Sequence, residues 1–203
     1  MAVYDVHPSV AMVQRLLAGL PEKTGHSLET WVRLVENQNL PDVKARTAWL
    51  KSAHGLGTNY AGWLAAYASG DHSDTGDPAQ YLRNASQWID AMYSGPKAAL
   101  LPVHEALVEL VRSLGPDVRV CPARTIVPIY RRHVMAQIKP TTLTRIDLGL
   151  SLGDTPAEGK LIDTGGFAKK DRITHRIPIS GLADIDEEVR RWVRFAYDRD
   201  DED

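Results

Sequence analysis

The chain has 203 residues, of which 43% are hydrophobic and 25% charged, and its formal net charge at pH 7 is −2. These values exclude a collagen-like chain, a wholly disordered chain and a nucleic-acid binder dominated by positive charge. The only cysteine, Cys121, cannot form an intramolecular disulfide. No apolar run reaches the roughly 20 residues of a membrane helix, and no signal peptide is evident at the N-terminus. We therefore expect a cytoplasmic protein that does not enter a membrane.

The first 69 residues carry only helical patterns. Ser27 is a candidate N-cap, and the apolar residues after it recur at the spacing of one helix face. A second helix is expected to begin at Asp42 and to end at His54, because Gly55 can adopt the left-handed conformation of a C-cap. A third is expected after Thr58. Residues 1–69 are therefore predicted to form an all-helical bundle.

A polar stretch without apolar residues follows, and it predicts a linker over residues 70–77. Asp77 and Pro78 are typical of an N-cap and a first helical position, so a helix is expected to begin there. Pro96 begins another helical pattern that continues to Leu114.

From Gly115 onward the apolar period changes from 3.6 to 2, which indicates strands. Short turns between them favour an antiparallel sheet. A final helix is expected from Asp184 to Tyr197, and residues 199–203 are predicted to be an acidic, disordered tail. The predicted class is α+β: residues 78–198 form a domain with helices on one face of a mostly antiparallel sheet. The predicted strand segments are 118–120, 125–131, 134–139, 143–150 and 172–179, with a short one near 160–162.

Two stretches carry a family resemblance. Residues 24–65, with the opening TG-x-SLE-x-W, a WLK stretch and an HGLG turn, resemble a helical domain of unknown function, family 4287. Residues 95–198, with LGPDV, PTTLTRIDLGL, THR and a closing W-x-x-x-AYD, resemble a second domain of unknown function, family 5655. The resemblance implies a bacterial, cytoplasmic protein of two parts. It implies no reaction, cofactor or catalytic residue.

The strand region is locally basic, and alternation within its strands predicts one apolar and one basic sheet face. Residues 117–182 hold 11 basic and 6 acidic residues. The leading hypothesis is a non-catalytic binding or regulatory module that takes an anionic ligand or nucleic acid on this face. The alternative explanation is a solvated outer face, partly neutralised by Asp147 and by the acidic tail. The candidate ligand-binding residues are Tyr130, Arg131, Lys139, Arg145, Arg172, His175 and Arg176.

A second hypothesis is a small enzyme with a site around Tyr130, Arg145, Asp147 and His175, in which a carboxylate orients a histidine base. It requires His175 and Asp147 to lie on the same face of the sheet. His175, however, alternates in step with Ile173 and Ile177, which are expected to point into the core. A core histidine is the alternative. Cys121 is expected to be a buried, inert thiol. No motif has the spacing of a metal or nucleotide site, so we expect no metal and no cofactor.

A third hypothesis is that the helical bundle docks onto a protein partner. The helices on either side of residues 54–57 have the outline of a helix-turn-helix, but residues 58–69 contain no Lys or Arg to anchor phosphates. An exposed apolar patch on residues 27–67 would favour the docking role.

Overall fold

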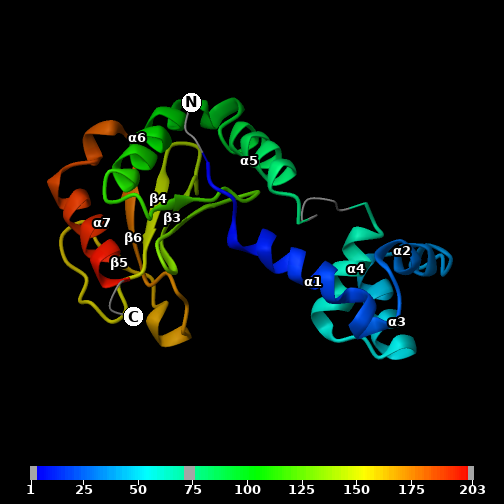
Figure 1. Ribbon diagram of the computed structural model, residues 1–203. Coiled ribbons are helices and arrows are strands. Elements are labelled where there is room, and N and C mark those ends of the chain that lie inside the picture. The colour runs from blue at the N-terminus through cyan, green and yellow to red at the C-terminus, as the bar shows by residue number, and fades with distance from the viewer. Residues whose placement is uncertain (1–3, 71–75, 201–203) are drawn as a thin grey trace. The chain divides into compact units, whose positions relative to one another are not determined.

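The computed structural model describes residues 4–70 and 76–200 of the chain (Figure 1). Most of the predicted linker, residues 71–75, lies outside the described residues. The described chain divides into two compact units, a helical unit over residues 7–81 and an α+β unit over residues 82–200 that also takes in residues 4–6. None of the helices in the described ranges is both long and apolar enough to cross a membrane.

The helical unit contains α1 (Pro8–Thr24), α2 (Leu28–Glu36), α3 (Val43–His54) and α4 (Thr58–Tyr67). The caps predicted at Ser27 and Gly55 are confirmed, because Ser27 accepts from the Thr30 N–H and Gly55 is left-handed with φ of 66°. Asp42, predicted as the first residue of the second helix, is its N-cap and accepts from the Ala45 N–H. Trp31 is buried at the centre and its indole N–H donates to the Thr24 hydroxyl over 2.7 Å. The TG-x-SLE-x-W pattern is therefore a packing and hydrogen-bonding pattern.

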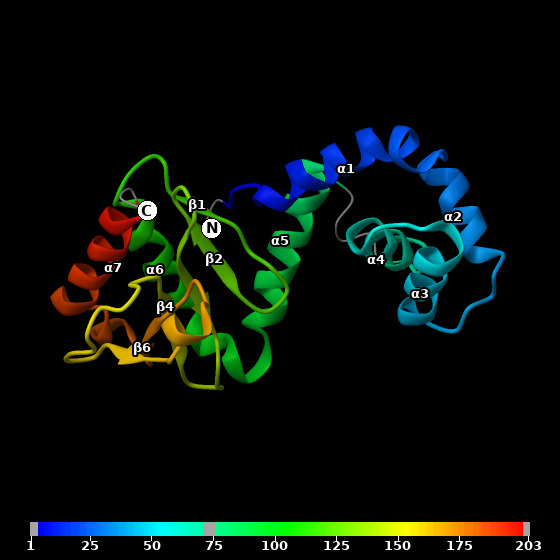
Figure 2. The same ribbon diagram turned by 90° about the horizontal axis from the view of Figure 1, so that it is seen from below.

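The α+β unit begins within α5 (Pro78–Met92), which starts at Pro78 as predicted, and continues through η1 (Gly95–Leu100) and α6 (Leu101–Arg112). After the strands come η3 (Leu182–Asp184) and α7 (Glu187–Arg199). Figures 1 and 2 show α6 and α7 beside each other along the sheet. Apolar residues of α5, α6 and α7 form one core with the strands, in which Leu107, Leu148 and Val193 are fully buried.

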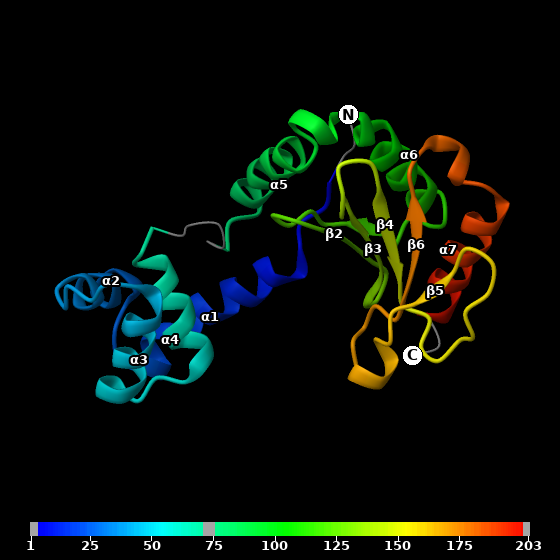
Figure 3. The ribbon, with the colours of Figure 1, turned by 180° about the vertical axis from the view of Figure 1, so that it is seen from behind.

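The sheet has six strands in the order β1-β2-β3-β4-β6-β5, and every pairing is antiparallel. The α+β class with an antiparallel sheet is thereby confirmed. Figure 3 shows the central strands side by side. The strands are β1 (Arg119–Val120), β2 (Val127–Tyr130), β3 (Val134–Lys139), β4 (Ile146–Leu150), β5 (Ile162–Asp163) and β6 (His175–Ile179).

The register separates the two faces of the sheet. Ile138, Leu148 and Ile177 are paired across β3, β4 and β6, and all three are buried. Lys139 and Asp147 are paired one position further along, so they point to the opposite face. Met135 departs from the predicted alternation. It is buried because the β2–β3 pairing skips it at an irregularity beside Tyr130.

The N-terminal segment differs from the expectation that residues 1–69 form one bundle. Asp5 joins the edge of the α+β unit: its N–H donates to the Val120 carbonyl over 2.9 Å, and its carboxylate accepts from the Val120 N–H over 2.8 Å. Arg112 donates to the same carboxylate over 2.6 Å. The segment pairs here because β1 would otherwise leave backbone groups unpaired at the sheet edge.

The predicted disordered tail is wrong for its first two residues. Arg199 is the last residue of α7, and Asp200 is only 2% exposed. The Asp200 carboxylate accepts from the backbone N–H groups of Arg132 and His133, over 2.8 and 3.0 Å, and from the Arg172 guanidinium. A high local charge does not prevent burial when each carboxylate oxygen has donors. Residues 201–203 lie outside the described residues.

Candidate functional site

Three of the predicted ligand-binding residues, Lys139, Arg145 and Arg176, lie on the outer sheet face around the Asp147 carboxylate. Arg145 and Arg176 each place a guanidinium nitrogen 3.0 Å from Asp147 Oδ1. Asp147 is itself only 14% exposed as a side chain, and Lys139 is its partner on β3. The predicted parity is therefore correct for Lys139, Arg145 and Arg176. Both arginines nevertheless form ion pairs with Asp147. Their charges are therefore partly neutralised, and this face is less suited to binding an anion.

Arg172 and Arg131 lie elsewhere. The segment before His175 leaves the ladder, so Arg172 is not part of β6 and its guanidinium pairs with the buried Asp200. Arg131 donates to Asp117 over 2.8 Å and lies 4.1 Å from the centre of the Tyr197 ring. Hydrogen bonds from Arg131 and Tyr197 hold the pKa of Asp117 below its usual value. The seven predicted residues therefore do not form a single surface.

His175 lies on the core side of the sheet, opposite Leu150, and is 1% exposed. Its Nδ1 is 2.8 Å from the Thr174 hydroxyl, and its Nε2 has no hydrogen-bond partner among the described residues. Asp147 lies on the opposite face, so the carboxylate cannot orient this imidazole. The proposed enzyme site is therefore not assembled around His175. Tyr130 lies apart from both, with the Arg119 guanidinium 5.8 Å from its ring centre, and burial raises its pKa.

Cys121 is buried beside the N-terminal segment, with its sulfur 3.8 Å from the Val6 carbonyl oxygen. Burial raises the pKa of its thiol to about 12. A thiol with such a pKa is not ionised near neutral pH and is a poor nucleophile. Within residues 4–70 and 76–200, no group of three His, Cys, Asp or Glu residues is arranged to hold a metal ion.

A cavity of about 540 Å³ lies where β3 turns into β4, and we call it the β3–β4 cavity. Three segments enclose it: the end of α5 with η1, the loop before β2, and the β3–β4 turn. Its lining residues are Ala91, Met92, Ser94, Pro96, Lys97, Arg124, Thr125, Lys139, Pro140, Thr141 and Leu143. Its volume is within the range of small-molecule sites.

The charge of the β3–β4 cavity is one-sided. Lys97, Arg124 and Lys139 line it, and no carboxylate is among the described residues of its lining. Lys97 is held in place, because its ammonium group donates to the Pro140 carbonyl over 2.7 Å. Lys139 is exposed at the end of β3. Of the hydroxyl side chains in the lining, Ser94 donates to the Ala91 carbonyl over 2.9 Å and Thr141 donates to the Lys139 carbonyl over 3.3 Å, so the cations are the main donors that the cavity offers to an anion.

A second cavity, of about 600 Å³, lies past the opposite end of β4, and we call it the loop cavity. The segment that includes η2 (Phe167–Lys169) borders it. The lining residues are Ser151, Gly153, Phe167, Ala168, Lys170, Asp171, Arg172, Thr174 and Arg199. Unlike the β3–β4 cavity it contains a carboxylate, that of Asp171, and an exposed aromatic ring, that of Phe167.

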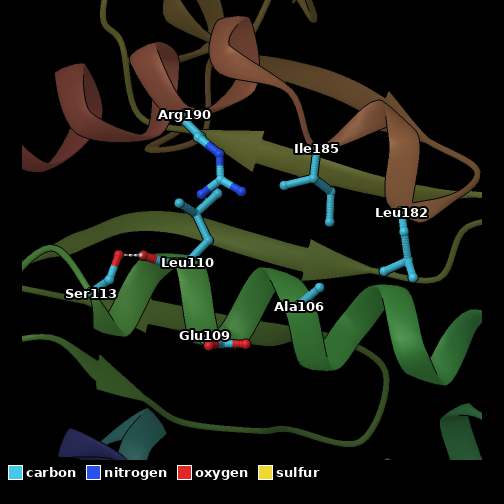
Figure 4. Close-up of a pocket in the computed structure, with 7 residues that line it drawn as sticks. All are labelled: Ala106, Glu109, Leu110, Ser113, Leu182, Ile185 and Arg190. Carbon is cyan, nitrogen blue, oxygen red and sulfur yellow. Dashed lines mark hydrogen bonds between the residues drawn. The ribbon is translucent and has the colours of Figure 1, made fainter.

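A third, smaller hollow of about 290 Å³ separates α6 from η3 and α7 (Figure 4). Leu110, Leu182 and Ile185 give it an apolar lining, and Glu109 and Arg190 contribute opposite charges. Ser113 donates its hydroxyl to the Leu110 carbonyl over 2.7 Å and is therefore occupied within its own helix. The hollow lacks the converging donors of the two larger cavities.

The docking hypothesis depends on an apolar patch over residues 27–67, all of which the structure describes. Of the large apolar side chains in that range, Val43 is the one with high exposure, at 41%. A single exposed valine is ordinary for a soluble surface and does not make a patch. Residues 27–67 therefore do not form the exposed apolar patch that would favour the docking role.

Two segments of the chain match models of known families. Residues 89–200, more than half of the chain, match the model described as Domain of unknown function (DUF5655). The chain belongs to the DUF5655 family. Residues 12–70 match a second model, Domain of unknown function (DUF4287). No curated protein and no solved structure matches the chain.

The DUF5655 segment contains every residue that lines the two larger cavities, from Ala91 to Arg199. The DUF4287 segment covers most of α1 and all of α2, α3 and α4. Residues 4–6, which pair with β1, belong to neither segment. The candidate ligand sites of this protein are therefore features of its DUF5655 domain.

Sequence reasoning identified Lys139 but missed Lys97 and Arg124 as its companions. Arg124 lies in a loop and Lys97 lies in the short 3-10 helix η1, and neither belongs to a strand whose alternation assigns a side chain to a face. The available signal was the basic run from Arg119 to Arg145, which contains no Asp or Glu and includes Arg124. Lys97 precedes that run by more than 20 residues, so only the fold brings it to the cavity.

Proposed function

We propose that this DUF5655 protein is a binding module for a small anionic ligand, which it holds in the β3–β4 cavity. The observation that carries the proposal is the convergence of Lys97, Arg124 and Lys139 on one cavity without a lining carboxylate. Cations that share a hollow attract an anion more strongly than the same cations dispersed on a surface.

The nature of the lining supports a small ligand over a nucleic-acid chain. Proteins that bind single strands without sequence preference stack bases on aromatic side chains. The lining of the β3–β4 cavity contains no aromatic residue, and its apolar part consists of alanine, methionine, leucine and proline. The ligand class that fits is a compact anion, such as a phosphate or diphosphate group, with an apolar portion against Met92 and Leu143.

The test is a calorimetric titration of the full chain with pyrophosphate in 50 and 200 mM NaCl. We expect saturable binding that weakens at the higher salt concentration, because the cations lie near solvent and are screened. Lys139→Ala and Arg124→Ala should each weaken binding about tenfold, the order of one charge-assisted hydrogen bond. Lys169→Ala is the matched control, since Lys169 is exposed and lines neither cavity.

A parallel titration with a ten-residue oligothymidylate distinguishes the ligand classes. If three cations contacted a single strand, the logarithm of its affinity would fall with the logarithm of salt with a slope of about −2. If oligothymidylate binds with that slope and pyrophosphate does not bind, the ligand of the β3–β4 cavity is nucleic acid and not a small anion. Absence of pyrophosphate binding below 10 mM in 50 mM NaCl would refute the proposal.

A further inference from the structure

The loop cavity differs in chemistry from the β3–β4 cavity. We propose that it is a second, independent site that binds a nucleoside monophosphate, with the base against Phe167 and the phosphate near Lys170 and Arg199. The inference does not depend on the β3–β4 cavity, because no residue lines both.

Phe167 supplies the first observation. Its ring is 57% exposed and lies at the border of the cavity. A planar base could stack on this ring, and such stacking contributes roughly 1–3 kcal/mol per base.

The loop that carries Phe167 is already organised. The N–H and the hydroxyl of Thr164 both donate to the Thr174 carbonyl, over 3.0 and 2.8 Å, and these bonds close the base of the loop. Within it, the Asp171 N–H donates to the Gly166 carbonyl over 2.9 Å. A Cβ atom on Gly166 would lie 2.5 Å from the Ile173 carbonyl oxygen, so the tight turn requires glycine here. A loop backbone held in this way would lose little conformational freedom on binding.

Lys170 supplies the second observation. It has φ of 61°, a left-handed conformation that costs a non-glycine residue of order 1 kcal/mol or more. The backbone nevertheless adopts it, with the Lys170 N–H bonded to the Phe167 carbonyl. Strain of this kind is concentrated at ligand sites, where the surrounding structure holds it in place.

The charges of the loop cavity fit a single phosphate. Lys170 and Arg199 form no ion pair with a carboxylate of the described residues, whereas Arg172 is engaged by Asp200. Arg199 lies over the backbone, and a Cβ atom on Gly153 would be 2.5 Å from its guanidinium. Asp171 adds one negative charge, which disfavours a polyphosphate but can accept a hydrogen bond from a ribose hydroxyl. Two cations and one carboxylate therefore match a ribose monophosphate better than a triphosphate.

The test is a calorimetric titration of the full chain with AMP and with UMP, alongside adenosine and ribose 5-phosphate. We expect a nucleotide to bind at least tenfold more tightly than either fragment. Phe167→Ala should weaken nucleotide binding about 5- to 100-fold, the range of one stacked base, and should leave ribose 5-phosphate unaffected. Lys170→Ala and Arg199→Ala should weaken both phosphate-bearing ligands.

Matched controls separate this site from the other one. Phe195→Ala removes a phenylalanine of α7 that is 41% exposed and lines neither cavity, so it should leave nucleotide binding unchanged. Lys139→Ala should weaken pyrophosphate binding and spare AMP. Failure of both nucleotides to bind below 1 mM would overturn the inference, as would an equal loss in Phe167→Ala and Phe195→Ala. Loss of AMP binding in Lys139→Ala would instead assign the nucleotide to the β3–β4 cavity.

Discussion

Basic residues of the α+β unit lie in two kinds of surroundings. Arg145 and Arg176 converge on Asp147, and Arg172 converges on the buried Asp200, so each of these groups encloses its own counter-charge. Lys97 and Lys139 form no ion pair within the described residues, and they line the β3–β4 cavity, whose described lining contains no carboxylate. An ion pair within the fold offers little to a ligand, because a second anion must compete with one that is already in place. The location of carboxylates therefore separates structural cations from candidate binding cations.

The first prediction addresses the most enclosed of these carboxylates. Asp200→Ala should lower the free energy of unfolding by about 2–4 kcal/mol, because it removes the acceptor of two backbone N–H groups and of Arg172. Urea unfolding measures the loss. Asp198→Ala is the control, since Asp198 is exposed and lies 3.9 Å from Arg194, and it should change the stability by no more than about 0.5 kcal/mol. If both substitutions lower the free energy of unfolding equally, the hydrogen bonds of Asp200 do not stabilise the fold.

The second prediction concerns a buried group with no ionic partner. His104 is completely buried, and burial lowers its pKa from 6.5 to about 4, while its Nε2 lies 3.1 Å from the Tyr4 hydroxyl. The unfolded chain binds a proton here below pH 6.5 and the folded protein does not, so the contribution to stability is full above that pH. It should be lost as the pH falls from 6.5 towards 4, by about 2 kcal/mol between pH 7 and pH 5.

Urea unfolding at pH 7 and pH 5 tests this contribution. His104→Phe keeps a buried ring but removes the titrating group, so the difference in stability between the two pH values should shrink by about 2 kcal/mol. An unchanged difference would mean that His104 is protonated in the folded protein, in conflict with its burial.

The sequence was informative where one residue type determines one local structure. Ser27 and Gly55 could be recognised as helix caps, and the alternation in β4 placed Leu148 and Asp147 on opposite faces. It indicated that Asp147 could partly neutralise the basic face, but not that this carboxylate would pair with both Arg145 and Arg176. It also missed Asp200, because composition alone makes an acidic C-terminus resemble a disordered one. Pairing between distant segments decides both outcomes, and no local pattern encodes it.

The last prediction compares the outer sheet face with the β3–β4 cavity directly, and its effects are the smallest. Replacing Arg145 and Arg176 together by alanine should change pyrophosphate affinity less than twofold, because Asp147 already engages both guanidinium groups. The stability cost should be about 1 kcal/mol or less, since both arginines are about one-third exposed. Lys139→Ala, which alters a nearby cation that forms no ion pair within the described residues, should weaken pyrophosphate binding about tenfold.

Asp147→Asn is the complementary variant. It leaves both arginines without a counter-charge, so retention of the protein on a polyanionic column should increase at low salt. If the double alanine variant loses as much pyrophosphate affinity as Lys139→Ala, the outer face takes part in ligand binding and internal pairing does not distinguish the two groups of cations.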